Sequence, residues 1–170
     1  MESTLTDLLL GMVFSGIGMA ITLPIVWLSF SETVTLNIRG FSAINFLVVL
    51  GVLFVYFTAA DISSTVSFVI CIIVAFFFHL GRVTEFLQRE DKRFRILFLS
   101  MGYTKNEYVT TYLFRKSLHR NVASFLMGWG LFSFSLTLSR ITTHFEFERI
   151  FGGVLLILLG LTSALLERKN

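Results

Sequence analysis

The stretch RVTEFLQREDKRFRILFLSMGYTKNEYVTTYLFRKSLHR, residues 82–120, interrupts a chain that is otherwise strongly apolar. It contains nine of the fourteen Lys and Arg residues. The whole chain of 170 residues is 55% hydrophobic and only 15% charged, with twenty Phe residues and a mean hydropathy of +0.79. This composition excludes an ordinary soluble domain and indicates that lipid surrounds most of the protein.

Five stretches lack Asp, Glu, Lys and Arg and approach the roughly 20 residues that a helix needs to cross a bilayer. They are residues 8–31, 40–60, 62–81, 121–139 and 150–166. Continuous apolar runs predict helices rather than the alternating strands of a membrane barrel. The sequence therefore predicts an all-α membrane bundle of about five transmembrane helices in one domain, residues 1–170, with 82–120 as a cytoplasmic amphipathic hairpin.

The distribution of basic residues predicts the orientation, because loops on the cytoplasmic side carry the excess of Lys and Arg. Placing 82–120 inside puts twelve Lys and Arg residues in the cytoplasm and only Arg140 and Arg149 outside. We therefore expect a multi-pass plasma-membrane protein with its N-terminus outside and its C-terminus in the cytoplasm. The first apolar run lacks a basic leader, which favours a retained helix over a cleaved signal peptide.

The first half of the charged stretch predicts an amphipathic helix that continues from the third apolar run. Phe94, Leu97, Phe98 and Met101 recur at helical spacing and form one apolar stripe among charged residues. Gly102 follows the stripe where a helix is expected to end, because glycine adopts the left-handed conformation without steric cost.

A second helix is predicted directly after this glycine. Thr104 and Glu107 have the spacing of a capping box, and Tyr103 and Tyr108 occupy the positions of a hydrophobic staple. The apolar face of the new helix comprises Tyr108, Val109, Tyr112 and Leu113. The chain is therefore expected to make a sharp helix-turn-helix at the membrane surface.

The segment REDKRFRILFLSMGYTKNEY, residues 89–108, resembles the cytoplasmic segment of FtsX/MacB-type ABC transporter permeases. The resemblance extends over about 62–166 and includes one span before the motif and two after it. The chain looks like a compact form, because the large extracytoplasmic domain of many members is missing and an extra span comes first. The matching positions are Glu90, Arg93, Ile96, Leu97, Ser100, Met101, Gly102, Thr104 and Lys105.

The resemblance implies a permease subunit, coupled through the hairpin to a separate ABC ATPase, that exports or extracts an amphiphile such as a lipid, an antimicrobial peptide or a hydrophobic small molecule. It also implies a homodimer or a hetero-oligomer with another membrane subunit. The residues implied in ATPase coupling are Arg93, Phe94, Arg95, Leu97, Phe98, Met101, Gly102, Tyr103, Thr104, Lys105 and Glu107.

Two other interpretations remain open at this point. The protein could be a non-transporting immunity or regulatory protein that binds a partner in the membrane. Alternatively, the hairpin is a basic element that only lies on the bilayer, held by its aromatic face and by anionic lipids.

Catalytic sites are not indicated by the sequence. The chain has no glycine-rich phosphate loop ending in Lys-Ser or Lys-Thr, and its three His residues are scattered without metal-ligand spacing. We therefore expect no enzymatic activity, no metal and no cofactor in this chain. Membrane topology accounts for the net charge of +3, so nucleic acid is not an expected partner.

Two further features are predicted to make contacts. His144, Glu146 and Glu148 in the last outside loop are a possible extracellular contact for a partner or peptide. Small residues indicate positions where membrane helices can approach closely. These are Gly11 with Ser15, Gly16 with Ala20, and Gly128, Gly130, Gly153 and Gly160.

Overall fold

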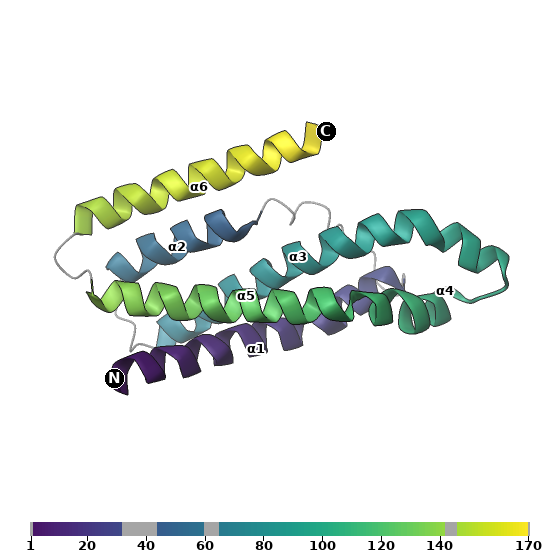
Figure 1. Ribbon diagram of the computed structural model, residues 1–170, viewed down its shortest axis with the longest axis horizontal. Helices are drawn as coiled ribbons and strands as arrows, with labels where there is room; N and C mark the ends of the chain where they lie inside the picture. Colours follow the sequence, from purple (N-terminus) through teal and green to yellow (C-terminus); the bar gives the residue numbers. More distant parts are fainter. Residues whose placement is uncertain (1, 32–43, 60–64, 142–145, 170) are drawn as a thin grey trace.

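The computed structural model describes residues 2–31, 44–59, 65–141 and 146–169, and these form an all-α bundle, as predicted (Figure 1). No strand occurs in these ranges. The elements are α1 (Glu2–Phe30), α2 (Phe46–Ala59), α3 (Thr65–Ser100), α4 (Lys105–Glu107), the π-helix η2 (Tyr108–Leu113), α5 (Phe114–Ile141) and α6 (Glu146–Lys169).

Four segments are long and apolar enough to cross a membrane: α1, which continues through Pro24, α3, α6, and the stretch from α4 to α5. The described α2 has 14 residues, about 21 Å, whereas the hydrocarbon core is about 30 Å thick. The second apolar run, 40–60, therefore does not become a full-length span within the described residues. Asn45 explains the late start, because its Oδ1 accepts a hydrogen bond of 3.1 Å from the Val48 N–H and so caps α2.

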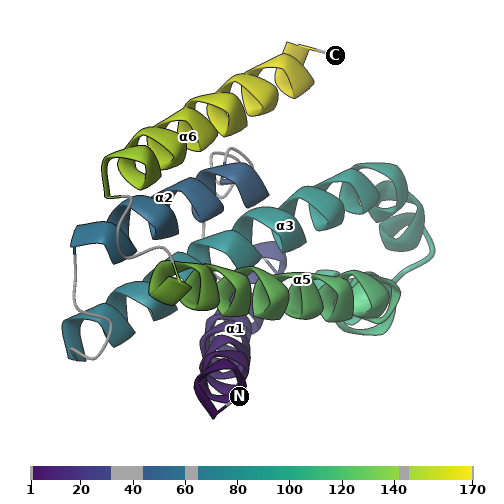
Figure 2. The same ribbon diagram turned by 60° about the vertical axis from the view of Figure 1, so that its left-hand side comes forward.

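The long helices form two packed groups. Helix α1 lies against α3 and α5, and these three enclose a core that includes Phe14, Phe78 and Phe132. Helix α2 pairs with α6 beside this group (Figures 1 and 2). Figure 1 shows α1, α3 and α6 running towards one end of the molecule and α2 and α5 running back, as repeated crossing of a membrane requires.

Glycines permit close helix contacts, both among α1, α3 and α5 and between α2 and α6. A Cβ on Gly51 would lie 2.4 Å from the Gly153 carbonyl oxygen, and one on Gly160 would lie 2.7 Å from Asn45 Oδ1. Close approach was predicted for Gly160 and Gly153 and is confirmed, as it is for Gly11 against α5 and Gly128 against α1 and α3. The prediction of close approach was wrong for Gly130, whose Cβ would meet no atom within 4 Å. A Cβ on Gly16 would make only an ordinary van der Waals contact, 3.8 Å from Phe125.

Candidate functional site: a closed helical hairpin at one end of the bundle

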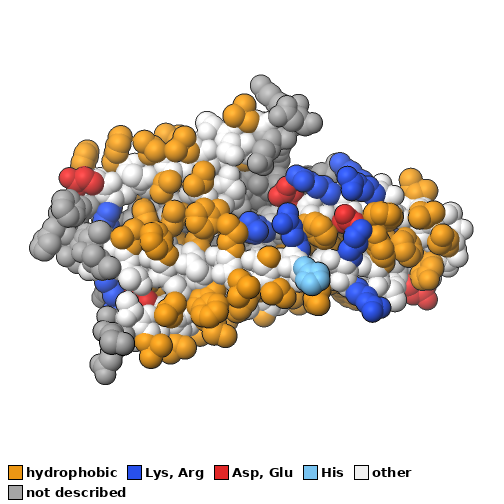
Figure 3. Space-filling view, viewed as in Figure 1, with side chains coloured by type: hydrophobic (Ala, Val, Ile, Leu, Met, Phe, Trp, Pro, Cys, Tyr) orange, Lys and Arg blue, Asp and Glu red, His pale blue; other side chains and the backbone are white. Residues whose placement is uncertain are grey.

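Residues 82–120, called the hairpin below, extend past the apolar part of the bundle. Helix α3 has 36 residues and is about 54 Å long, so its last turns project beyond a hydrocarbon core of about 30 Å. The chain then returns through α4, η2 and the start of α5. Figure 3 shows that Lys and Arg side chains gather over this part of the visible face.

The turn at the tip is a Schellman motif centred on Gly102. Its φ is +89°, the left-handed conformation in which glycine is favoured. The Tyr103 N–H donates to the Phe98 carbonyl at 3.2 Å, and the Gly102 N–H donates to the Leu99 carbonyl at 3.1 Å. The Phe98 and Tyr103 rings pack edge to face with centroids 5.4 Å apart, which adds the usual apolar contact. The predicted end of the helix at Gly102 is confirmed.

The predicted capping box after this glycine is also confirmed. The Glu107 N–H donates to Thr104 Oγ1 at 3.3 Å, while the Thr104 N–H and hydroxyl donate to Glu107 Oε2 at 2.8 and 2.7 Å. These bonds from the backbone and side chain of Thr104 lower the pKa of the exposed Glu107 carboxyl. The tip is therefore closed by its own hydrogen bonds on both sides of the turn.

Aromatic rings fill the space between the two legs of the hairpin. Tyr112 packs on Phe98 with ring centroids 4.5 Å apart, on Phe94 at 5.4 Å and on Tyr108 at 5.8 Å. Tyr103 and Tyr108, the two predicted staple residues, both pack on Phe98. The rings join the legs by edge and face contacts that are favourable beyond their burial.

Lys116 links the legs closer to the bundle. Its Nζ lies 2.7 Å from Glu90 Oε2, 3.1 Å from the Tyr112 hydroxyl and 4.6 Å from the centroid of the Phe94 ring. The hydrogen bonds to Glu90 and Tyr112 raise the pKa of Lys116, so the ammonium form is favoured. Because Glu90 is nearly buried, this ion pair is better protected from water than one on an open surface.

The first turns of the returning leg are anchored in a second apolar core. Tyr108, Val109 and Leu113 are buried, and they belong to one cluster with Val26 of α1 and Leu87 of α3. This confirms the predicted apolar face of the returning helix. The end of α1 therefore supports the hairpin from the side.

The returning leg begins as a π-helix, which the sequence did not reveal to us. The Phe114 N–H donates to the Val109 carbonyl, five residues back, and the Thr111 hydroxyl donates to the Glu107 carbonyl. Three consecutive β-branched residues, 109–111, were a usable signal, because such side chains crowd the preceding turn of an α-helix. Single π-turns of this kind are frequently found at functional sites.

The residues predicted to contact an ATPase divide into two groups. Phe94 and Phe98 point into the hairpin, Gly102, Thr104 and Glu107 build the turn, and Arg95 forms an ion pair of 3.3 Å with Asp91. Leu97, Met101 and Tyr103 are exposed, as are Arg93 and Lys105. The single stripe expected from helical spacing is therefore split between the two sides of the helix.

Ile96, Leu97, Met101 and Tyr103 form what we call the tip patch. Their exposed fractions are 80, 48, 64 and 42%, although they lie outside the apolar part of the bundle. Large apolar side chains that stay exposed beyond the packed bundle mark a contact with a protein or a membrane. The tip patch is thus the part of the hairpin best suited to a partner.

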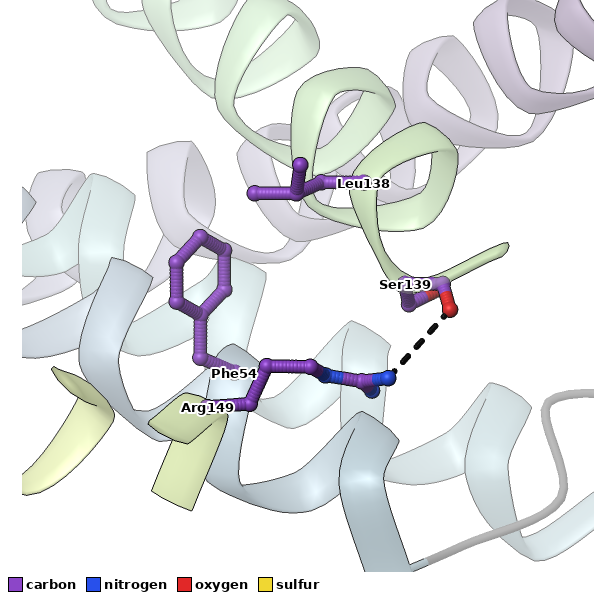
Figure 4. Close-up of a pocket in the computed structure, with 4 residues that line it drawn as sticks. All are labelled: Phe54, Leu138, Ser139 and Arg149. Carbon is purple, nitrogen blue, oxygen red and sulfur yellow. Dashed lines mark hydrogen bonds between the residues drawn. The ribbon is translucent and has the colours of Figure 1, made fainter. Parts of the chain in front are cut away.

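At the opposite end, two arginines tie the helix ends together. Arg149 donates to the Phe57 carbonyl of α2 at 3.1 Å and reaches the Ser139 carbonyl of α5 at 3.5 Å (Figure 4). Arg140 lies 3.0 Å from the carboxylate of Asp7, which is 1% exposed. The count of basic residues predicted that these two arginines lie on the outer side of the membrane, but the sequence did not predict their contacts with other helices.

The predicted contact loop at that end is only partly visible. His144 and the side chain of Glu146 lie outside the described residues, and Glu148 is exposed in the first turn of α6. Among the residues that are described, no group of three or more His, Cys, Asp or Glu side chains has metal-binding geometry.

A buried polar contact joins the three central helices. His79 of α3 lies 3.1 Å from Ser15 Oγ of α1 and 2.9 Å from Ser124 Oγ of α5. Gly128 makes room for it, because a Cβ there would lie 2.8 Å from the imidazole ring. Polar side chains that satisfy one another in this way hold membrane helices together.

No protein-family model matches this chain, and no curated protein or solved structure matches it significantly.

Proposed function

We propose that this protein is the membrane subunit of an ABC transporter and that its hairpin docks on a separate ATPase. The observation that carries the proposal is the exposed tip patch at the end of a hairpin that is closed by a Schellman motif and a capping box. An apolar, rigid, basic-flanked tip is what a groove on a soluble protein can bind. In this proposal the hairpin and the C-terminus are cytoplasmic and the N-terminus is outside the plasma membrane.

The architecture supports a mechanical role for the hairpin. Helix α3 is continuous from the bundle to the tip, and α1 shares an apolar core with the first turns of the returning leg. A push on the tip would therefore move the ends of at least two long helices together, as rigid elements do in domain closure. The proposed cargo is an amphiphile, such as a lipid or an apolar peptide, as the resemblance of residues 89–108 to the permease segment implies.

A second membrane subunit belongs to the same proposal. Helix α6 packs on α2 and leaves its other side uncovered, with Phe147, Phe151 and Leu158 exposed by 78, 62 and 58%. In membranes such a face packs either on lipid or on another helix. We place the dimer contact, with a second copy or with another subunit, on this face.

The test is purification of the tagged chain in mild detergent from its native membranes, identification of any P-loop ATPase that comes with it, and ATPase assays of the complex in proteoliposomes. Leu97→Glu with Met101→Glu should abolish both co-purification and stimulated hydrolysis, because two carboxylates would enter an apolar contact. Leu118→Glu is the matched control, since Leu118 is 61% exposed on the hairpin but outside the tip patch.

Charge is tested separately. Arg93→Glu should weaken the complex, whereas Arg115→Glu, also exposed but on the other leg, should not. Arg95 is unsuitable for this test because its ion pair with Asp91 stabilises the hairpin itself. Unchanged ATPase binding in the Leu97 and Met101 double variant would refute the docking role, and a stoichiometric partner without a P-loop would favour the immunity or regulatory alternative.

A further inference from the structure

Two arginines face each other where the hairpin joins the apolar bundle. Arg82 is the first charged residue after the apolar run of α3, and Arg120 is the last before that of α5. Together with Glu85 they line a cavity of about 40 Å³. Helices α3 and α5 run in opposite directions (Figure 1), so the end of one apolar run and the start of the other meet at this cavity.

The charges in this cavity are not balanced. Arg82 and Arg120 repel each other, and the one carboxylate that faces them in the described part of the chain, Glu85, is shared with Arg89 at 2.6 Å. The Nε of Arg82 is buried without a hydrogen-bond acceptor among the described residues. A buried donor without a partner and an excess of positive charge both favour an anion.

A separate apolar groove lies between α2 and α3. Its volume is about 170 Å³, and its wall is wholly apolar. The lining residues are Ile44, Val48, Val49, Val52, Val74 and Phe77. A groove with such walls in the apolar part of a membrane bundle fits a hydrocarbon chain.

The spacing of the two features matches one leaflet of a bilayer. Val74 in the groove and Glu85 in the cavity are about three turns apart along α3, so they lie on the same side of the helix, roughly 16 Å from each other. Half the hydrocarbon thickness of a bilayer is about 15 Å. A headgroup at the arginines would therefore place its acyl chain along the groove.

We propose that the protein binds an anionic phospholipid from the leaflet next to the hairpin, with the phosphate between Arg82 and Arg120 and one acyl chain in the groove. Basic pockets between membrane helices are suited to such headgroups. The site goes beyond the proposed transport function and does not depend on an ATPase.

The experiment uses the full-length protein in nanodiscs of phosphatidylcholine. A phosphatidylglycerol probe with a diazirine in its acyl chain is added, and the labelled peptides are identified by mass spectrometry. Labelling should concentrate on residues 44–52 and 74–77. Arg82→Gln with Arg120→Gln should reduce it by roughly thirtyfold, a factor of about five for each basic residue at an anionic surface. Arg115→Gln, on the exposed side of the hairpin, should leave it unchanged.

Two further variants distinguish binding from a folding defect. Glu85→Gln removes the competing carboxylate and should increase labelling. Val52→Trp should fill the groove and abolish labelling at 74–77. Equal labelling by a phosphatidylcholine probe, or full labelling of the double arginine variant, would overturn the proposal. Displacement of the probe by inorganic phosphate alone would assign the arginines to a free anion rather than to a lipid.

Discussion

Replacing Gly102 by Ala is the cleanest test of the hairpin turn. The substitution adds one methyl group, and no atom lies within 4 Å of the position that its Cβ would take. Its cost is therefore conformational, because the backbone keeps φ at +89° in the Schellman turn. For a non-glycine residue this conformation costs about 1–2 kcal/mol. The equilibrium between the closed and the open turn should shift by about 5- to 30-fold.

Amide hydrogen exchange measures this shift directly. The Tyr103 and Gly102 amides donate the two bonds of the Schellman motif, so peptides that cover 97–108 should exchange faster by the same factor. Gly102→Val should behave like the Ala variant or worse, whereas Gly102→Asn should lose less, because Asn tolerates left-handed geometry.

Gly130→Ala is the matched control for this experiment. A Cβ there also meets no atom within 4 Å, but Gly130 lies inside α5 and has no positive φ. Alanine should therefore be neutral or stabilise the helix by up to about 1 kcal/mol. Wild-type exchange in both the Ala and the Val variants at Gly102 would refute the argument that the turn depends on left-handed geometry.

Three other substitutions or conditions test the packing and electrostatics. Gly153→Ala should destabilise the α2–α6 pair by about 1–3 kcal/mol, because its Cβ would lie 2.8 Å from Val55. The midpoint of thermal unfolding in detergent measures this loss. Gly152→Ala should leave the midpoint unchanged, because its Cβ would meet no atom within 4 Å. Arg140→Gln should lower the thermal unfolding midpoint, because it leaves the buried Asp7 carboxylate without its cation. The expected cost is about 1–2 kcal/mol, since Arg140 itself is partly exposed. Asp7→Asn in the same chain should restore part of the loss, and an additive loss would contradict the pairing. The contribution of Glu107 to the closed tip should be complete above the ordinary glutamate pKa and be lost as the pH falls through its lowered pKa. The protection factors of peptides at the tip, which correct for the slower intrinsic exchange in acid, should therefore fall with pH in the wild type but not in Glu107→Gln.

Local signals in the sequence predicted the turn of the hairpin well. Gly102, Thr104 and Glu107 act on backbone groups only a few residues away, so their spacing in the sequence is already their geometry. The apolar runs likewise predicted a helical membrane bundle, because length and hydropathy alone decide whether a helix can cross.

Contacts between distant segments could not be derived in this way. The pairing of Asp7 with Arg140, and of His79 with Ser15, depends on which helix faces become neighbours. Helical spacing identified Leu97 as part of an apolar stripe, but the stripe alone could not show that this residue faces away from the returning leg. Asn45 was a readable cap that would have shortened the second apolar run.

The two legs of the hairpin are not mechanically equivalent, and this bears on the proposed coupling. The leg formed by α3 is an uninterrupted α-helix, whereas the other leg passes through the π-helix η2 before it enters the bundle. A π-turn has poorer continuity of hydrogen bonds and is a natural place for a helix to bend. Tyr108, Val109 and Leu113 of η2 are held by the core that includes α1. A force on the tip would therefore pass along α3 and sideways into α1, while η2 absorbs the change in angle on the side of α5.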